Sequence, residues 1–156
     1  MDCIILDIDG TLWDTTPTVA DAWNEALKGR TDVAWRATPD NLKKLFGKPM
    51  WAIAAEAFPE LPQEEQMKLM DLCCENEEEV LKKRPGTVFE GVVETIRELS
   101  KKYKVCIVSN CQAGYIEVFL SATGYSGYFK GHLCPGDTGR AKAENIMQIC
   151  REYHLK

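Results

Sequence analysis

Two short apolar runs predict buried strands of a parallel sheet. The first is Cys3-Ile4-Ile5-Leu6, and the second is Val105-Cys106-Ile107-Val108. Uninterrupted apolar runs of this length, rich in β-branched residues, are typical of strands that are covered on both faces. Residues 129–134 form a third strand-like stretch. We therefore expect an α/β fold built on a parallel sheet.

Between the first two runs the pattern changes to the period of helices. Residues 14–85 carry many helix signals and few strand-like runs. The helices expected here begin at Thr15-Thr16-Pro17 and then span Asp40–Phe46, Pro49–Phe58 and Pro62–Lys83. Pro85-Gly86 marks the return to the sheet. The pattern thus predicts a discontinuous core, residues 1–13 plus 86–156, with a helical insertion at 14–85.

Two more helices are expected on either side of the second strand. The apolar stripe of the first consists of Val88, Val92, Val93, Ile96 and Leu99, and that of the second consists of Ile146, Ile149, Cys150 and Tyr153. Gly136-Asp137-Thr138-Gly139 is interpreted as a turn that leads into the second of these helices. Within the insertion, Glu77-Glu78-Glu79 is expected to be a solvated helix face.

Two carboxylates follow the first strand at once, in Asp7-Ile8-Asp9-Gly10-Thr11. Ligands of open parallel sheets lie beyond the carboxyl ends of the strands, and Gly10 allows a tight turn and a close approach to a ligand. Asp7 is the candidate nucleophile, which would accept a phosphoryl group. Asp9 points to the same side of an extended backbone and is the candidate acid and base.

A divalent cation is expected beside these two acids, because a carboxylate that attacks a phosphate dianion meets strong repulsion. Mg2+ suits carboxylate and phosphate oxygens. A calcium-binding loop would need Asp or Asn at its fifth position and Gly at its sixth, where this chain has Thr11 and Leu12. The remaining alternative for the two acids is a helix N-cap with a solvated neighbour.

Polar residues also follow the second strand and open the last helix. Ser109 and Asn110 offer a hydroxyl and an amide, which hydrogen-bond phosphate oxygens without adding charge. Lys142 lies in the first turn of the last predicted helix, where the macrodipole disfavours a cation. This placement suggests that Lys142 compensates the charge of Asp7 and a phosphate. The alternative is a solvated surface lysine.

Together these segments resemble the haloacid dehalogenase-like hydrolase superfamily, in its phosphoglycolate phosphatase-like branch. The matching segments are Asp7-Ile8-Asp9-Gly10-Thr11-Leu12, Ser109-Asn110, and Lys142 with the Ala-Glu-Asn-Ile that follows it. The resemblance implies a Rossmann-like core with an α-helical cap, Asp7 as nucleophile and Asp9 as acid and base. It further implies that Mg2+ is held by the Asp7 carboxylate and the Asp9 backbone carbonyl. The phosphate-binding residues that it implies are Gly10, Thr11, Ser109, Asn110 and Lys142.

The sequence departs from this family at the fourth motif, an acidic segment that follows a further strand downstream of the lysine helix. The sequence ends at His154-Leu155-Lys156, about where that strand is expected. We therefore expect a truncated core that lacks its C-terminal strands. The family topology places the missing strand beside the Asp7 strand. Because an exposed hydrophobic edge recruits partners, this predicts a homodimer through the sheet edge.

Within the insertion, Gly47-Lys48-Pro49-Met50 resembles the cap loop that faces the active site in such enzymes. Lys48 is therefore the candidate for substrate specificity, and a solvated loop lysine is the alternative. The same two alternatives, a residue for substrate specificity or a solvated residue, apply to Arg36. Each tryptophan is interpreted either as a pocket residue or as a core residue; the four are Trp13, Trp23, Trp35 and Trp51.

Composition is consistent with a compact cytoplasmic protein. A chain of 156 residues with 45% hydrophobic content is able to build one core. A net charge of −5 argues against a nucleic-acid surface, and no run approaches the roughly 18 apolar residues of a membrane span. Seven cysteines without a Cys-x-x-Cys spacing predict free thiols in a reducing compartment.

The function expected from these residues is Mg2+-dependent hydrolysis of small phosphorylated metabolites through an aspartyl-phosphate intermediate. A sugar-phosphate mutase of the same superfamily uses the same residues and cap, but that branch usually carries Val where this chain has Thr11. The third interpretation is a truncated, catalytically impaired member that only binds phosphate or metal.

Overall fold

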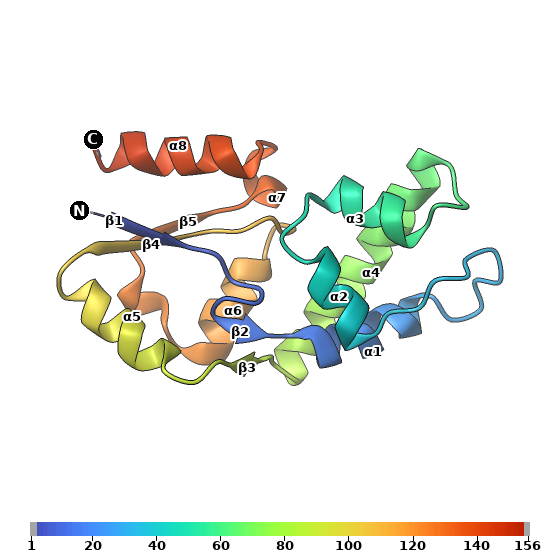
Figure 1. Ribbon diagram of the computed structural model, residues 1–156, viewed down its shortest axis with the longest axis horizontal. Coiled ribbons are helices and arrows are strands. Elements are labelled where there is room, and N and C mark those ends of the chain that lie inside the picture. Colours follow the sequence, from blue (N-terminus) through green and yellow to red (C-terminus); the bar gives the residue numbers. More distant parts are fainter. Residues whose placement is uncertain (1–2, 155–156) are drawn as a thin grey trace. The chain divides into compact units, whose positions relative to one another are not determined.

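The computed structural model describes residues 3–154 and divides the chain into two compact units (Figure 1). The first, which we call the sheet unit, consists of the chain up to Asp14 and from Thr87 onward. The second, the helical unit, is Thr15–Gly86. The chain therefore passes from the sheet unit into the helical unit and back again.

The sheet unit contains a three-stranded parallel sheet in the order β1-β4-β5. Its strands are β1 (Cys3–Leu6), β4 (Lys104–Val108) and β5 (Gly131–Leu133). The four apolar residues of β4 are buried, whereas β1, with β4 on one side, is only half-buried. The α/β fold with a parallel sheet is confirmed. The third strand is shorter than the predicted stretch at 129–134.

Helices cover both faces of this sheet, because side chains alternate along a strand and apolar residues point to either side. On one face, Ile149 of α8 (Lys142–Glu152) packs against Cys106 and Val108. The opposite face carries α5 (Val92–Ser100) and α6 (Tyr115–Thr123), as Figure 1 shows. The short helices η1 (Ser126–Tyr128) and α7 (Pro135–Thr138) lie in the connections that flank β5. Because the helices cover the two faces of the sheet, the candidate site residues lie at the carboxyl ends of its strands.

Two predictions about the sheet unit were wrong. Val88 does not belong to a helix: it lies in β3 (Thr87–Val88), which pairs antiparallel with β2 (Trp13–Asp14). This pairing keeps the chain extended, and α5 begins only after Gly91, whose φ of 78° suits glycine. The predicted turn at 136–139 is instead the helix α7, which ends at the left-handed Gly139.

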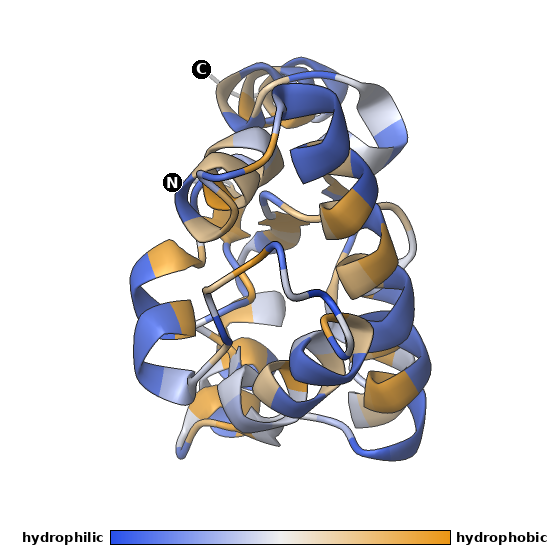
Figure 2. Cartoon of the chain, turned by 90° about the vertical axis from the view of Figure 1, so that its right-hand side faces the viewer, coloured by the Kyte–Doolittle hydropathy of each residue, from blue (hydrophilic) through white to orange (hydrophobic). Residues whose placement is uncertain are grey.

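The helical unit consists of four helices, and each boundary that was predicted lies within two residues of the observed one. They are α1 (Thr16–Ala26), α2 (Pro39–Leu45), α3 (Met50–Ala57) and α4 (Gln63–Lys83). Thr38 caps α2, because its hydroxyl accepts the Asn41 backbone N–H at 3.2 Å. Apolar and polar stretches alternate along the helices (Figure 2), as expected of helices with one buried side.

Glu77 corrects the prediction of a solvated acidic face on α4. Its side chain is buried, with 4% exposure, and one carboxylate oxygen accepts a 2.6 Å hydrogen bond from Nε1 of Trp23. On a helix, position 77 shares a face with positions 70, 74 and 81, which form the buried stripe. Of the three consecutive glutamates, Glu77 therefore belongs to the core.

Replacing Trp23 by Phe is expected to destabilise the protein by about 1–3 kcal/mol, because Glu77 loses the indole N–H while it remains buried. Urea unfolding followed by circular dichroism measures this difference. Trp51→Phe is the matched control, since Trp51 is 64% exposed and its substitution should stay within about 0.5 kcal/mol. Equal stability of the two variants would contradict a structural role for this hydrogen bond.

Five of the seven cysteines are buried, and Cys3 and Cys150 are half-buried. All seven are free. Burial raises the pKa of Cys73 and of Cys106 to about 12, so these thiols stay protonated at neutral pH. None of the helices in the described part of the chain combines the length and the hydropathy that a membrane span requires.

Candidate active site

Asp7 and Lys142 form the centre of the candidate site. Asp7 is the first residue after β1, and Lys142 is the first residue of α8. The Lys142 ammonium donates to Oδ2 of Asp7 at 2.6 Å, and both side chains are 27% exposed. Oδ1 of Asp7 accepts the backbone N–H of Ile8 at 2.9 Å. One charged donor and one neutral donor thus orient this carboxylate.

The chain turns sharply directly after Asp7. The carbonyl of the buried Ile8 accepts the backbone N–H groups of Thr11 at 3.0 Å and Leu12 at 2.8 Å. Gly10 has a φ of 71°, and its N–H donates to the Trp13 carbonyl at 3.1 Å. The amides of Gly10 and Thr11 therefore serve the turn itself, and phosphate binding by these two residues stays a prediction.

Asp9 has a partner that the sequence analysis missed. The hydroxyl of Tyr115, on α6, donates to Oδ1 of Asp9 at 2.5 Å. The Tyr115 ring is buried, with 1% exposure, and Asp9 is half-buried. Asp7 and Asp9 thus bind different side chains, although both follow the same strand. The one signal in the sequence was a tyrosine in the first turn of the helix after the second strand.

Ser109 and Asn110 follow β4 at the same edge of the sheet as Asp7. The parallel register aligns Leu6 with Ile107, so the residues after the two strands emerge side by side. Ser109 is buried, with 2% exposure, and its backbone N–H donates to the Leu133 carbonyl at 3.4 Å. Ser109 and Asn110 therefore lie at the edge where Asp7 lies, and phosphate binding by these two residues stays a prediction.

A buried asparagine holds the start of α8; the sequence analysis included it in the matching segment after Lys142 but gave it no role. Asn145 has 0% exposure. Its Oδ1 accepts the Thr138 hydroxyl at 2.9 Å, and its Nδ2 donates to the Arg140 carbonyl at 3.3 Å. Glu144 also accepts the Ala141 backbone N–H at 2.9 Å. These contacts fix the turn before Lys142 and thereby help to orient its side chain toward Asp7.

The segments that carry Ser109 and Lys142 touch at Gly136. Its N–H donates to the Cys111 carbonyl at 3.1 Å. A Cβ at position 136 would lie 2.0 Å from the Ala113 backbone nitrogen and 2.3 Å from the Gln112 carbonyl carbon. Only glycine allows this approach, so the loop after β4 and the segment before α8 are held in one arrangement.

Cys111 and Cys134 lie at this junction and are buried. A hydrogen bond between the two thiols, together with burial, raises the pKa of Cys111 well above its ordinary value. Cys134 also contacts Oδ2 of Asp137 at 3.0 Å. A protonated thiol is a poor nucleophile, so Cys111 is not a candidate for this role.

The structure places Lys48 in the helical unit, between α2 and α3. Its ammonium pairs with the Glu56 carboxylate at 2.5 Å. A role for Lys48 in substrate specificity stays a prediction. Trp13 and Trp23 are core residues, with 0% and 1% exposure, whereas Trp51 is exposed. Arg36 donates to backbone carbonyls of its own loop, at Val33 and Trp35.

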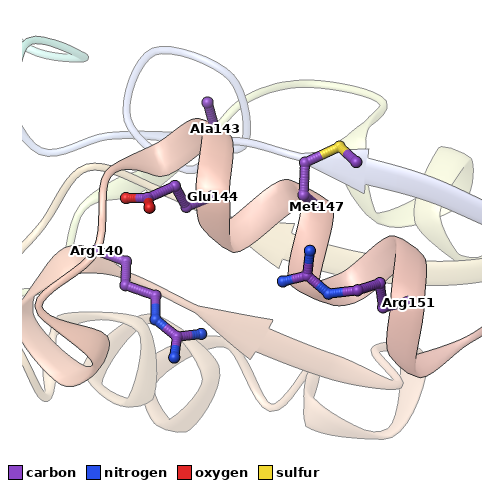
Figure 3. A pocket seen from close by; sticks show the side chains of 5 residues that line it. All are labelled: Arg140, Ala143, Glu144, Met147 and Arg151. Atoms are coloured by element: carbon purple, nitrogen blue, oxygen red, sulfur yellow. The ribbon is translucent and has the colours of Figure 1, made fainter.

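A pocket of about 530 Å³ opens on the outer face of α8 (Figure 3). Its lining consists of Arg140, Ala143, Glu144, Met147 and Arg151. Met147 is 55% exposed, and none of the predicted site residues lines the pocket. The pocket is therefore separate from the Asp7–Lys142 pair.

The arrangement at the strand ends is suited to an anionic substrate. A partly exposed carboxylate can attack an electrophilic centre, and the adjacent ammonium offsets part of the negative charge that gathers there. A second carboxylate and a buried hydroxyl lie at the same edge. Within residues 3–154, no group of three or more His, Cys, Asp or Glu side chains is placed to hold a metal ion.

A protein-family model matches nearly the whole chain. The model of the haloacid dehalogenase-like hydrolases matches residues 4–156. A search of curated proteins found no match. The segments after β1 and β4 and at the start of α8 all fall inside the matched range.

Solved structures share the fold at low sequence identity. A haloacid dehalogenase-like hydrolase from Streptococcus pneumoniae has a TM-score of 0.83 at 17% identity, over 99% of this chain and 71% of that one. A protein described as a predicted phosphoglycolate phosphatase from Haemophilus somnus has a TM-score of 0.79 at 19% identity, over 99% and 72%. A predicted phosphatase from Clostridium acetobutylicum has a TM-score of 0.77 at 16% identity, over 99% and 71%.

Proposed function

We propose that this chain, which belongs to the haloacid dehalogenase-like hydrolases, cleaves small phosphate monoesters with Asp7 as its nucleophile. The observation that carries the proposal is the 2.6 Å contact between Asp7 and Lys142, two residues 135 positions apart. A lysine that neutralises a carboxylate beyond the end of a parallel strand prepares the site for a second, phosphate-borne negative charge. Two of the structural neighbours described above are named as phosphatases.

In the proposed reaction, a carboxylate oxygen of Asp7 attacks phosphorus and forms a new P–O bond. The bond to the leaving alkoxide breaks, and Asp9 gives that oxygen a proton. Asp9 then takes a proton from a water molecule, which attacks the aspartyl phosphate and releases inorganic phosphate and the Asp7 carboxylate. Lys142 and the Ser109 hydroxyl bind the phosphoryl oxygens in both steps.

The donor atoms at this edge fit Mg2+. This ion is commonly held by one or two carboxylates together with substrate phosphate and water, rather than by a cage of protein ligands. The Asp7 carboxylate is partly exposed, and the Asp9 backbone carbonyl is the second proposed ligand. When bound, the ion would supply positive charge that lowers the repulsion between carboxylate and phosphate.

Removal of divalent cations is expected to reduce hydrolysis of p-nitrophenyl phosphate to the background rate, because the single charge of Lys142 then offsets only part of the repulsion between the carboxylates and the phosphate dianion. Activity is measured after dialysis against EDTA and again after addition of Mg2+, with circular dichroism to show that the fold is unchanged. Restored activity supports the proposal. Undiminished hydrolysis in the chelated protein would rule out a role for Mg2+.

The helical unit is proposed to act as a cap over the site. Helices inserted into a phosphatase core can exclude water during attack on phosphorus. The support here is that Thr15–Gly86 forms a compact unit inserted between Asp7 and the rest of the sheet unit. Lys48, in the loop between α2 and α3, remains its candidate contact to the substrate.

A further inference from the structure

Tyr115 is held both by ring packing and by a hydrogen bond from its hydroxyl. It lies in the first turn of α6, its ring is 1% exposed, and its hydroxyl reaches Oδ1 of Asp9. Trp13 lies edge-on to this ring, with centroids 6.2 Å apart and planes at 68°. Trp13 in turn packs edge-on to Phe119, one turn along α6, at 5.0 Å. These ring contacts hold the Tyr115 side chain in the orientation in which its hydroxyl donates to Asp9.

We propose that Tyr115 is a positioning residue that fixes the Asp9 carboxylate for proton transfer to the leaving group. The inference rests on the proposed function, in which Asp9 is the acid and base. A carboxylate on a turn can rotate about two side-chain bonds, and proton transfer requires one orientation within hydrogen-bond reach of the leaving oxygen. A hydrogen bond from a rigid donor selects that orientation before substrate binds.

Packing alone does not account for the hydroxyl of Tyr115. A phenylalanine would fill the same space and keep the edge contact with Trp13. The hydroxyl adds a donor to a half-buried carboxylate, and Asp9 comes from a different segment of the chain, 106 residues away. The contact therefore ties α6 to the turn after β1, where the chemistry is proposed to occur.

The test is Tyr115→Phe, assayed by kcat/KM with two substrates in Mg2+. For an alkyl phosphate such as 2-phosphoglycolate, whose alkoxide needs a proton to leave, kcat/KM should fall about tenfold or more. For p-nitrophenyl phosphate, whose phenolate leaves without a proton, kcat/KM should change by less than about threefold. A structural role alone would lower both values equally, and that result would overturn the proposal.

Two further variants act as controls for this test. Tyr128→Phe removes a hydroxyl from a half-buried tyrosine of the same unit and should leave both substrates unchanged. Asp9→Asn should show the same dependence on the leaving group, and adding Tyr115→Phe to it should cost little more, because the two residues act through one step. Additive losses in the double variant would overturn the proposal.

A crystal structure of Tyr115→Phe tests the positioning itself and needs no turnover. We expect the Asp9 side chain to adopt a second rotamer or to lose its single orientation. An unchanged Asp9 rotamer would overturn the proposal. If the unmodified protein hydrolyses neither substrate, the proposed function fails, whereas the rotamer of Asp9 still decides the role of Tyr115.

Discussion

Asp7→Asn is expected to lower phosphatase activity by about 10^4-fold or more. An amide has nearly the shape of a carboxylate but cannot attack phosphorus, and loss of a nucleophile commonly costs this much in kcat. The side chain would still lie beside Lys142 and Ile8, so the loss would report chemistry rather than misplacement. The measurement is hydrolysis of p-nitrophenyl phosphate in Mg2+ by the unmodified protein and the variant.

The fold of the Asp7→Asn variant should be retained. The Asp7–Lys142 pair is partly solvated, and exposed ion pairs contribute at most about 1 kcal/mol. Thermal unfolding verifies this. Asp71→Asn, an exposed substitution on α4, is the matched control and should keep full activity. Retained activity in Asp7→Asn would show that another residue is the nucleophile, and the proposed mechanism would be wrong.

Gly136→Ala is expected to destabilise the protein by at least about 3 kcal/mol, the largest effect on stability predicted here. The added Cβ would lie 2.0 Å from the Ala113 backbone nitrogen, far inside contact distance. Because the neighbouring atoms are backbone, no change of rotamer relieves the overlap, and the two segments must separate. The same separation would move Ser109 and Lys142 apart, so activity should fall as well.

Gly127→Ala is the matched control for this prediction. A Cβ at position 127 meets no atom within 4 Å, and Gly127 lies in the same unit, in η1. Its effect should stay within about 0.5 kcal/mol. Chemical denaturation of both variants measures the difference. A Gly136→Ala protein as stable as Gly127→Ala would mean that the loop after β4 is not held against the segment before α8.

Most of the elements could be predicted from the sequence because their signals are local, but the helix α6 (Tyr115–Thr123) was not predicted. The runs at Cys3–Leu6 and Val105–Val108 are strands, and each predicted boundary of the helices in the helical unit lies within two residues of the observed one. Val88 was misassigned because a two-residue strand is too short to show a period, and its pairing with Trp13 joins segments 75 residues apart.

The residues of the candidate site likewise fall into those that could be predicted from the sequence and those that could not. Asp7, Ser109 and Lys142 could be identified because each stands at the end of a strand or the start of a helix, where polar residues have a chemical meaning. The structure adds that Lys142 reaches Asp7 directly. Tyr115 could not be identified, because a tyrosine in the first turn of a helix looks the same whether its hydroxyl meets solvent or Asp9.

The amino-acid sequence by itself therefore determined which segments have the hydrophobic pattern of a helix and which that of a strand. It also determined the order along the chain of the segments that carry the candidate site residues, and the family to which the chain belongs. Only the tertiary structure decided which distant groups meet: Tyr115 with Asp9, Trp23 with Glu77, and Gly136 with the loop after β4. The physical reason is that hydrophobic periodicity is a property of neighbours along the chain. A hydrogen bond or a close approach depends instead on how whole elements pack, which no single segment encodes.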